Sequence, residues 1–177
     1  ELPEVEVVRR GLDQHVVGRT FQRVEVLHPR AARGNTVDLE TALPGLTITG
    51  TGRRGKYLWL TLRDDAALLV HLRMSGQMLV AEHGTVTSPH LRIRADIGDA
   101  ELDFVDQRTF GFWQYTQLID GIPQPAVHIA PDPFEDDFDL RETARAMNLP
   151  VAALDLVLYL CVTAAVVISV QTIGNIL

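Results

Sequence analysis

A two-residue period through the middle of the chain is the feature that most constrains its fold. Between residues 21 and 115, short segments alternate apolar with polar side chains or are rich in β-branched and aromatic residues. These segments cover residues 21–26, 46–49, 56–62, 67–72, 77–80, 90–95, 101–105 and 111–115. Turn residues separate most of them, as at Asp64-Asp65, Ser75-Gly76 and Gly98-Asp99. About eight short strands at this spacing predict an antiparallel sandwich or barrel.

A helix is expected before the strands, because residues 1–12 follow a longer period. Val5, Val8 and Leu12 fall on one helical face, which we expect to be buried. Glutamates come first and arginines follow, as the helix macrodipole favours. Gly18 is the expected stop of this helix.

Composition narrows the class of protein and its partners. In a chain of 177 residues, Cys161 is the only cysteine, which excludes an internal disulfide and a thiolate-rich zinc site. The start is acidic where a signal peptide would be basic and then apolar, so we expect a cytoplasmic protein. The net charge of −7 argues against non-specific nucleic-acid binding, but residues 1–63 carry 10 basic and 7 acidic residues. A nucleic-acid partner is therefore expected to meet the first half of the chain.

The last third of the chain changes character twice. Residues 123–138 are rich in proline and acidic residues and are predicted to form a linker. Asp139 caps a predicted helix, which Pro150 interrupts. Residues 151–170 carry a single charge, Asp155, and the uncharged run is shorter than the roughly 20 apolar residues of a membrane span. We expect a core or partner-facing segment here, with membrane insertion as the less favoured alternative.

Lys56 is a compositional anomaly, because the other 15 of the 16 basic residues are arginines. It follows Arg53-Arg54-Gly55 and precedes a predicted strand. A lysine is a compact point charge whose pKa can shift enough for proton or imine chemistry, whereas arginine is a permanently charged fork. Spacing alone leaves two interpretations open: a solvated lysine at the start of a strand, or an amine presented to a phosphate or a reacting carbon.

Four motifs, taken in order, resemble the formamidopyrimidine-DNA glycosylase family. They are Glu1-Leu2-Pro3-Glu4-Val5-Glu6, Arg53-Arg54-Gly55-Lys56-Tyr57, His71-Leu72-Arg73-Met74-Ser75-Gly76 and Asp106-Gln107-Arg108-Thr109-Phe110-Gly111. Residues 1–138 match that family in order and spacing, and residues 173–176 resemble the start of its helix–two-turn–helix module. The opening hexapeptide favours the oxidised-purine branch over the related endonuclease VIII branch.

The resemblance implies a mainly β (α+β) fold, with an N-terminal helix packed on a two-sheet antiparallel β-sandwich. Residues 1–122 correspond to the N-terminal catalytic domain of the family and residues 123–138 to the linker. Residues 139–177 correspond to a short helical segment, the beginning of a truncated helix–two-turn–helix region. We expect a monomer.

The implied function is bacterial base-excision repair of oxidised purines, namely 8-oxoguanine and formamidopyrimidines, with lyase activity at the abasic site by β,δ-elimination. The partner is damaged double-stranded DNA at the nucleoid, from which the damaged nucleotide is flipped out. The family's nucleophile is the secondary amine of an N-terminal proline. Its place is immediately before Glu1, the first residue of this sequence, so the proline itself is not in the sequence. A terminal amine has a pKa near 8, which leaves a useful neutral fraction at pH 7.

The resemblance assigns catalytic roles to three residues. Glu1 corresponds to the family's acid–base group in opening the sugar, and Glu4 to an acidic residue that supports the site. Lys56 corresponds to the lysine that contacts the phosphate beside the lesion. Without the motif context, acids at a helix start are more simply dipole or cap residues.

Five further residues correspond to DNA-binding positions. Met74, Arg108 and Phe110 correspond to residues that fill the gap left by the flipped base, with an apolar wedge, a stacking ring and an arginine for the widowed base. Taken singly, they are more simply a core methionine, a surface arginine and a core phenylalanine. His90 lies near a family position, although a strand histidine bonded by its neighbours fits equally well. Asn175 belongs to the resemblance to the helix–two-turn–helix module.

Two departures from the family carry expectations of their own. Arg73 stands where the family usually has glycine, so an altered turn is expected at Met74. The family's four-cysteine zinc finger has no counterpart, so no cofactor is expected from this chain, and DNA affinity should be lower. The alternatives are a catalytically silent fragment or divergent homologue that acts as a weak DNA-binding or interaction module, and a β-sandwich anchored to a partner or membrane through its tail.

Overall fold

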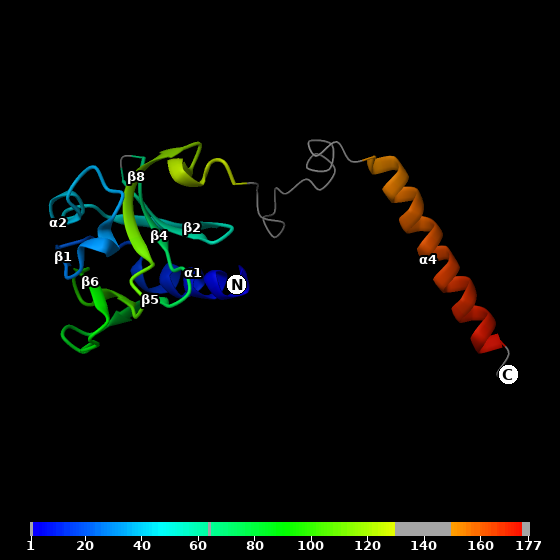
Figure 1. The fold of residues 1–177 in the computed structure, drawn as a ribbon, viewed down its shortest axis with the longest axis horizontal. Coiled ribbons are helices and arrows are strands. Elements are labelled where there is room, and N and C mark those ends of the chain that lie inside the picture. The colour runs from blue at the N-terminus through cyan, green and yellow to red at the C-terminus, as the bar shows by residue number, and fades with distance from the viewer. Residues whose placement is uncertain (1, 64, 130–149, 175–177) are drawn as a thin grey trace. The chain divides into compact units, whose positions relative to one another are not determined.

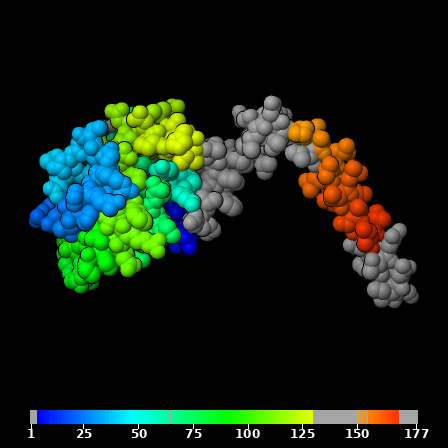
Figure 2. All heavy atoms as spheres, viewed as in Figure 1, coloured from blue at the N-terminus to red at the C-terminus, as the bar shows by residue number. Residues whose placement is uncertain are grey.

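The computed structural model describes residues 2–63, 65–129 and 150–174. The chain divides into two compact units, Glu1–Pro131 and Asp132–Leu177, and in the space-filling view the first unit is one continuous body (Figure 2). The first unit begins with helix α1 (Leu2–Val16), which ends two residues before Gly18, as predicted.

Two antiparallel sheets follow α1, which confirms the predicted fold class (Figure 1). One sheet has the strand order β1-β6-β7-β5 and the other the order β2-β3-β4-β8-β9. The strands are β1 (Arg23–Val26), β2 (Ile48–Arg54), β3 (Tyr57–Leu62), β4 (Ala66–His71), β5 (Gly76–Ala81), β6 (Leu91–Asp96), β7 (Glu101–Asp106), β8 (Phe112–Ile119) and β9 (Ile122–Pro123). Helix α1 contacts β2 and β3 of one sheet and β5 of the other.

Short elements fill the stretch where the sequence showed no period. They are η1 (Pro29–Ala32) and α2 (Leu39–Ala42) after β1, and η2 (Gln124–Ala126) after β9. Each of the first two starts at a side-chain cap: the ring of His28 accepts from the Arg30 amide, and the carboxylate of Asp38 accepts from the Glu40 amide. At four residues or fewer, these elements are too short to produce a readable hydrophobic period.

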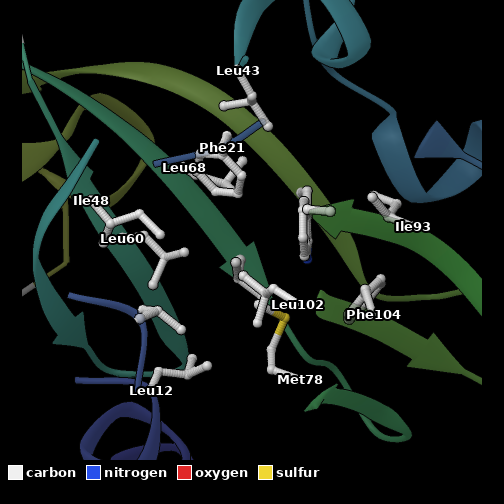
Figure 3. Packing of buried hydrophobic residues seen from close by; sticks show 14 of the residues in the cluster. Leu12, Phe21, Leu43, Ile48, Leu60, Leu68, Met78, Ile93, Leu102 and Phe104 are labelled. Atoms are coloured by element: carbon white, nitrogen blue, oxygen red, sulfur yellow. The ribbon is translucent and has the colours of Figure 1, made fainter. Parts of the chain in front are cut away.

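The core lies between the two sheets and under α1. Figure 3 shows Leu12 of α1 among side chains from both sheets, with Leu60 of β3 and Met78 of β5 among them. Val5 and Leu12 are buried and Val8 is partly buried, which confirms the predicted face of the helix. Strand β4 is buried along its whole length, because a smaller apolar cluster covers the outer face of its sheet.

Two predicted boundaries shift in a way that matters for function. The strand expected at residues 46–49 is an isolated bridge followed by β2, which continues to Arg54 and pairs it with Tyr57. Gly55 and Lys56 therefore form the two-residue turn of a β-hairpin, and Lys56 does not start a strand as predicted. Gly55 has a φ of +57°, a backbone conformation that glycine adopts without steric cost. The lysine consequently projects from the tip of a hairpin.

The second unit contains helix α4 (Val151–Gly174), which begins directly after Pro150. Large apolar side chains along it are exposed: Leu156, Val157, Leu158, Tyr159, Leu160, Val162, Val166, Val167 and Ile168. Because these side chains are exposed, the expectation of a core segment is wrong, and the expectation of a partner-facing segment stays a prediction. No helix in the described ranges is long and apolar enough to cross a membrane. The predicted helix start at Asp139, most of the linker, Glu1 and Asn175 lie outside the described residues.

Candidate functional site

A pocket of about 150 Å³ opens where the start of α1 meets the tips of both sheets. Its wall comes from α1, from the β2–β3 turn and from the segment between β4 and β5. The lining residues are Glu4, Val5, Val8, Lys56, His71, Leu72, Arg73, Met74 and Gly76. Pockets that enclose a whole small ligand measure roughly 300–1,000 Å³, so this pocket suits one end of an extended ligand.

Three of the site residues predicted from sequence meet in this pocket. Glu4 comes from α1, Lys56 from the hairpin tip and Met74 from the turn after β4, although up to 70 residues separate them in the chain. The pocket thus combines a carboxylate, an amine and an exposed thioether. Glu4 and Lys56 are both exposed to solvent, so each can meet a ligand that enters from outside.

A network around Glu6 holds the hairpin to α1. The Glu6 carboxylate accepts hydrogen bonds from Arg9 and Arg10 of its own helix at 2.8–2.9 Å and from Nε of Arg53 at 3.1 Å. The bond from Arg9 is the main reason that the pKa of Glu6 falls to about 2, although burial opposes it. Arg53 also donates to the Gly55 carbonyl at 3.2 Å, directly before Lys56. The hairpin tip is therefore anchored on both sides.

His71 lines the same pocket and was not among the predicted site residues. It is buried, and its Nδ1 accepts from the Arg73 amide at 3.1 Å, so the proton of the neutral ring lies on Nε2. Burial lowers the pKa of His71 to about 4, with further contributions from the charges of Arg73, Lys56 and Arg33. A neutral imidazole thus stands among cations as a hydrogen-bond donor. The clustering of basic residues around it was not visible in the sequence order.

Met74, Arg108 and Phe110 gather beside the pocket on two neighbouring loops. Met74 is 74% exposed and Phe110 is 46% exposed, so the interpretation of either as a core residue is wrong. Nη1 of Arg108 lies 3.4 Å from Sδ of Met74. Met74 and Phe110 are thus exposed apolar side chains on neighbouring loops, and Arg108 contacts Met74. We call these three residues the wedge.

The turn that carries Met74 contains an unusual backbone conformation. Arg73 is exposed and has a φ of +54°, a region where side chains with Cβ are uncommon and glycine is favoured. Thr109, between Arg108 and Phe110, has a φ of +56°. Each wedge loop therefore holds one non-glycine residue in the left-handed region, which persists only where surrounding contacts fix it.

His90 lies apart from the pocket lining. Its amide donates to Ser88 Oγ at 3.1 Å, its carbonyl accepts from the Asp106 amide, and it is partly buried. Among the described residues, no three side chains of histidine, cysteine, aspartate or glutamate come together as a metal site would require. The groups that the described residues offer in this region are an amine, carboxylates, an imidazole and guanidinium groups.

The chain is similar to known proteins of a single family. Residues 1–113 match the family described as formamidopyrimidine-DNA glycosylase, N-terminal domain. The formamidopyrimidine-DNA glycosylase of Corynebacterium jeikeium is 49% identical over 174 residues, which cover 89% of this chain and 60% of the relative. That of Mycolicibacterium smegmatis is 57% identical over 148 residues, covering 78% of this chain and 51% of the relative. The chain thus spans between half and 60% of the length of these relatives.

Solved structures of the Lactococcus lactis protein Fpg are also similar. In its complex with DNA that contains Fapy-dG, that protein matches with a TM-score of 0.69 at 34% identity, covering 82% of this chain and 56% of the other. Its complex with DNA that contains an abasic site matches with a TM-score of 0.63 at 38% identity, covering 66% and 43%. Both neighbours are bound to damaged DNA.

Proposed function

The chain belongs to the formamidopyrimidine-DNA glycosylase family, and from that premise we propose that its first unit is the catalytic half of a base-excision repair enzyme. Its substrate is a duplex that contains an oxidised purine, 8-oxoguanine or a formamidopyrimidine. The observation that carries the proposal is that Glu4, Lys56 and Met74 line one and the same pocket, beside the exposed wedge residues. A flipped nucleotide needs such a pocket, and the duplex it leaves needs such a wedge.

The reaction follows from a neutral amine held next to the sugar. The secondary amine of a proline immediately before Glu1 attacks C1′ of the flipped nucleotide, the bond to the damaged base breaks, and the base leaves with a proton. Glu1 is proposed to supply the acid–base step that opens the sugar, and Glu4 to support it. The resulting imine makes the sugar protons acidic, so β- and then δ-elimination expel the two phosphates. An imine intermediate thereby divides one difficult step into easier ones.

The phosphate beside the lesion is proposed to bind between Lys56 and His71. Lys56 is exposed at an anchored hairpin tip, and the neutral imidazole of His71, which lines the same pocket, carries its proton on Nε2. A cation and a neutral hydrogen-bond donor together suit a phosphate oxygen. Both attract the anion, but only the cation loses the hydration of a full charge when the phosphate binds. Lys56 is thus a phosphate ligand in this proposal and not the nucleophile.

The wedge is proposed to occupy the space that the flipped nucleotide vacates. Met74 and Phe110 offer apolar surface to the neighbouring base pairs, and Arg108 can donate hydrogen bonds to the unpaired opposite base. Their exposure supports this role, because both side chains are accessible to a ligand. His90 and Asn175 remain proposed DNA contacts.

Zinc has no place in the steps above. The family usually carries a four-cysteine zinc finger, but Cys161 is the only cysteine of this sequence and cannot form that donor set. The site of action that follows from a DNA substrate is the nucleoid. DNA affinity is proposed to be low and to depend only weakly on salt, because few cations face the duplex and each phosphate contact adds to the salt slope.

Covalent trapping tests the proposed function. The full chain is prepared with a proline before Glu1, incubated with a duplex containing 8-oxoguanine, and reduced with borohydride. We expect a stable protein–DNA adduct, and none from the same protein with an acetylated N-terminus, because acetylation removes the nucleophilic amine. Absence of an adduct from the protein with the free proline would contradict the proposal.

A catalytically silent DNA-binding or interaction module is the second candidate. The exposed apolar surface of α4 and the acidic second half of the chain favour it, since neither is suited to DNA. Binding of an abasic duplex without any trapped adduct would support this alternative over the enzyme.

A further inference from the structure

Asp106, the last residue of β7, lies where three separate segments meet. Its amide donates to the carbonyl of His90 at 2.9 Å, and its own carbonyl accepts from Nε of Arg92 at 2.8 Å. These bonds tie the segment before β6 to the end of β7. The backbone of Asp106 thus connects His90 and Arg92 with the end of β7, after which the loop with Arg108 begins.

The carboxylate of Asp106 connects the two loops of the wedge. Oδ1 accepts from the hydroxyl of Ser75 at 2.5 Å and from the amide of Arg108 at 3.1 Å. Oδ2 accepts from the amide of Gly111 at 2.7 Å. Ser75 follows Met74 directly, while Arg108 and Gly111 bracket Phe110. One side chain therefore bonds both loops at the same time.

The bonding keeps this carboxylate charged although it is fully buried. Burial alone would raise the pKa of Asp106, but the Ser75 hydroxyl and the backbone amides of Gly111 and Arg108 lower it below its ordinary value. A buried charge without a salt-bridge partner in contact is expensive unless several donors surround it. The donors here come from both loops, so both loops must keep their positions for the charge to remain stable.

Strand pairing brings the two loops side by side. Gly76, the first residue of β5, is paired with Asp106, so the Met74 turn enters one strand where the Arg108 loop leaves its neighbour. Close packing restricts the loop further, because a Cβ on Gly111 would lie 2.5 Å from Cζ of Phe104. Each loop contains a strained residue, Arg73 or Thr109, whose conformation has to be held from outside.

We propose that Asp106 is a positioning residue that locks the Met74 turn and the Arg108–Phe110 loop into one rigid wedge. Its role in DNA recognition rests on the proposed function above. A wedge that is already ordered avoids the entropy of ordering two loops during insertion, and so favours a duplex with a missing base over an intact one. If the bonds from Asp106 to the two loops are lost, the preference for a duplex with a missing base falls, while general binding to DNA phosphates is unchanged.

The decisive variant is Asp106→Asn, compared with Asp103→Asn on the same strand. Asparagine has the same shape, but its NH2 group replaces one of the two accepting oxygens. That NH2 group faces either the Ser75 hydroxyl and the Arg108 amide, or the Gly111 amide, and cannot accept their hydrogen bonds. Asp103 is equally buried and bonds Nε of Arg94 on β6 at 3.0 Å, so its variant controls for the general loss of a buried carboxylate in β7. Both variants are made in the full 177-residue chain.

Two measurements are made on each variant. The first is amide hydrogen exchange of peptides covering residues 72–76 and 107–111, without DNA. The second is binding, by fluorescence anisotropy, to a duplex with a tetrahydrofuran abasic analogue and to the undamaged duplex. For Asp106→Asn we expect exchange in both peptides to rise, and the preference for the abasic duplex to fall, each by about tenfold, as the loss of a hydrogen bond to a charged group predicts. Asp103→Asn is expected to lower the melting temperature, but to change neither the exchange in these two peptides nor the preference for the abasic duplex.

Ser75→Ala provides an independent variant in case Asp106→Asn does not fold. It keeps the carboxylate and breaks only the link between the loops, so exchange at residues 107–111 should still rise, and Ser75→Thr should restore it. If amide hydrogen exchange is unchanged in the loop that does not carry the substitution, Asp106 does not link the two loops. That conclusion holds whatever the result of DNA binding. Faster exchange with an unchanged preference for abasic DNA would overturn the role in recognition. If the wild-type chain shows no preference, the proposed function fails, and hydrogen exchange alone still decides whether Asp106 links the loops.

Discussion

The guanidinium of Arg53 bonds the carboxylate of Glu6, with Nε 3.1 Å from Oε2, and so joins the β2–β3 hairpin to α1. Arg53 is only 7% exposed at its side chain and Glu6 is 25% exposed. Because Arg53 also bonds the Gly55 carbonyl, the position of Lys56 depends on a carboxylate in a different element. The wall of the pocket is thus set by a contact between residues 47 positions apart in the chain.

Glu6→Gln is expected to destabilise the first unit by about 2 kcal/mol, because it removes the carboxylate that the buried guanidinium of Arg53 bonds on α1. Urea unfolding followed by tryptophan fluorescence measures this change. Glu25→Gln is the matched control, since Glu25 is half-exposed and its nearest cation, Arg23, is 3.9 Å away. The control should change the free energy of unfolding by less than about 0.5 kcal/mol. Equal effects from both variants would contradict the anchoring role.

Lys56→Ala is expected to weaken DNA binding and to reduce the slope of log K against log salt by about 1, because one phosphate contact is lost. Anisotropy titrations at several salt concentrations measure the slope. Arg63→Ala removes the same charge just beyond the other end of β3, where the side chain is exposed and lies away from the pocket lining. Its slope should equal that of the wild type. The same slope for both variants would show that only net charge matters.

Arg73→Gly is expected to raise the free energy of unfolding by about 1 kcal/mol, because glycine adopts a φ of +54° without the steric penalty that a Cβ carries there. Arg73→Ala removes the same charge but keeps the Cβ, so it should show no such gain. Thermal unfolding of both variants separates backbone strain from charge. A similar melting temperature for the two would mean that the left-handed backbone carries little strain.

Periodicity predicted most of the fold because strand position and side-chain direction are local properties. The strands from β3 to β8 lie within a few residues of the predicted segments, since each alternates or is uniformly apolar over several residues. The Gly55-Lys56 turn was not predicted, because the charged pair Arg53-Arg54 breaks the apolar pattern, although both residues belong to β2 and their guanidinium groups are bonded. Arginine in a strand is compatible with burial only when such partners exist, and these come from distant residues.

The candidate site was predictable only where a motif carried it. Lys56, Met74 and Arg108 each stand out in a short motif. His71 and Asp106 open two of the same motifs, but their roles come from contacts with other segments, such as the bond between Asp106 and Ser75. Ser75 and Asp106 are 31 residues apart, and the strand register that joins them depends on the whole sandwich. Long-range pairing of this kind leaves no local pattern in a single sequence.

His71 gives the first unit a specific dependence on pH. Its pKa is about 4 in the folded protein and about 6.5 when exposed, so the unfolded chain takes up the proton first as the pH falls. The stabilising contribution is complete above about pH 6.5 and is lost progressively between that value and about pH 4. His71→Gln cannot titrate, so its free energy of unfolding should fall by about 2 kcal/mol less than that of the wild type between neutral pH and about pH 5.

Urea unfolding at the two pH values measures this difference. His15→Gln, at an exposed histidine of α1, is the control and should keep the wild-type dependence. The same experiment with Arg73→Ala adds a second check, because the charge of Arg73 helps to lower the pKa of His71. Removing that charge should raise the pKa of His71 toward its ordinary value, so less stability should be lost on acidification and the loss should end at a higher pH. A wild-type dependence in His71→Gln would mean that the imidazole is not held neutral among the cations of the pocket.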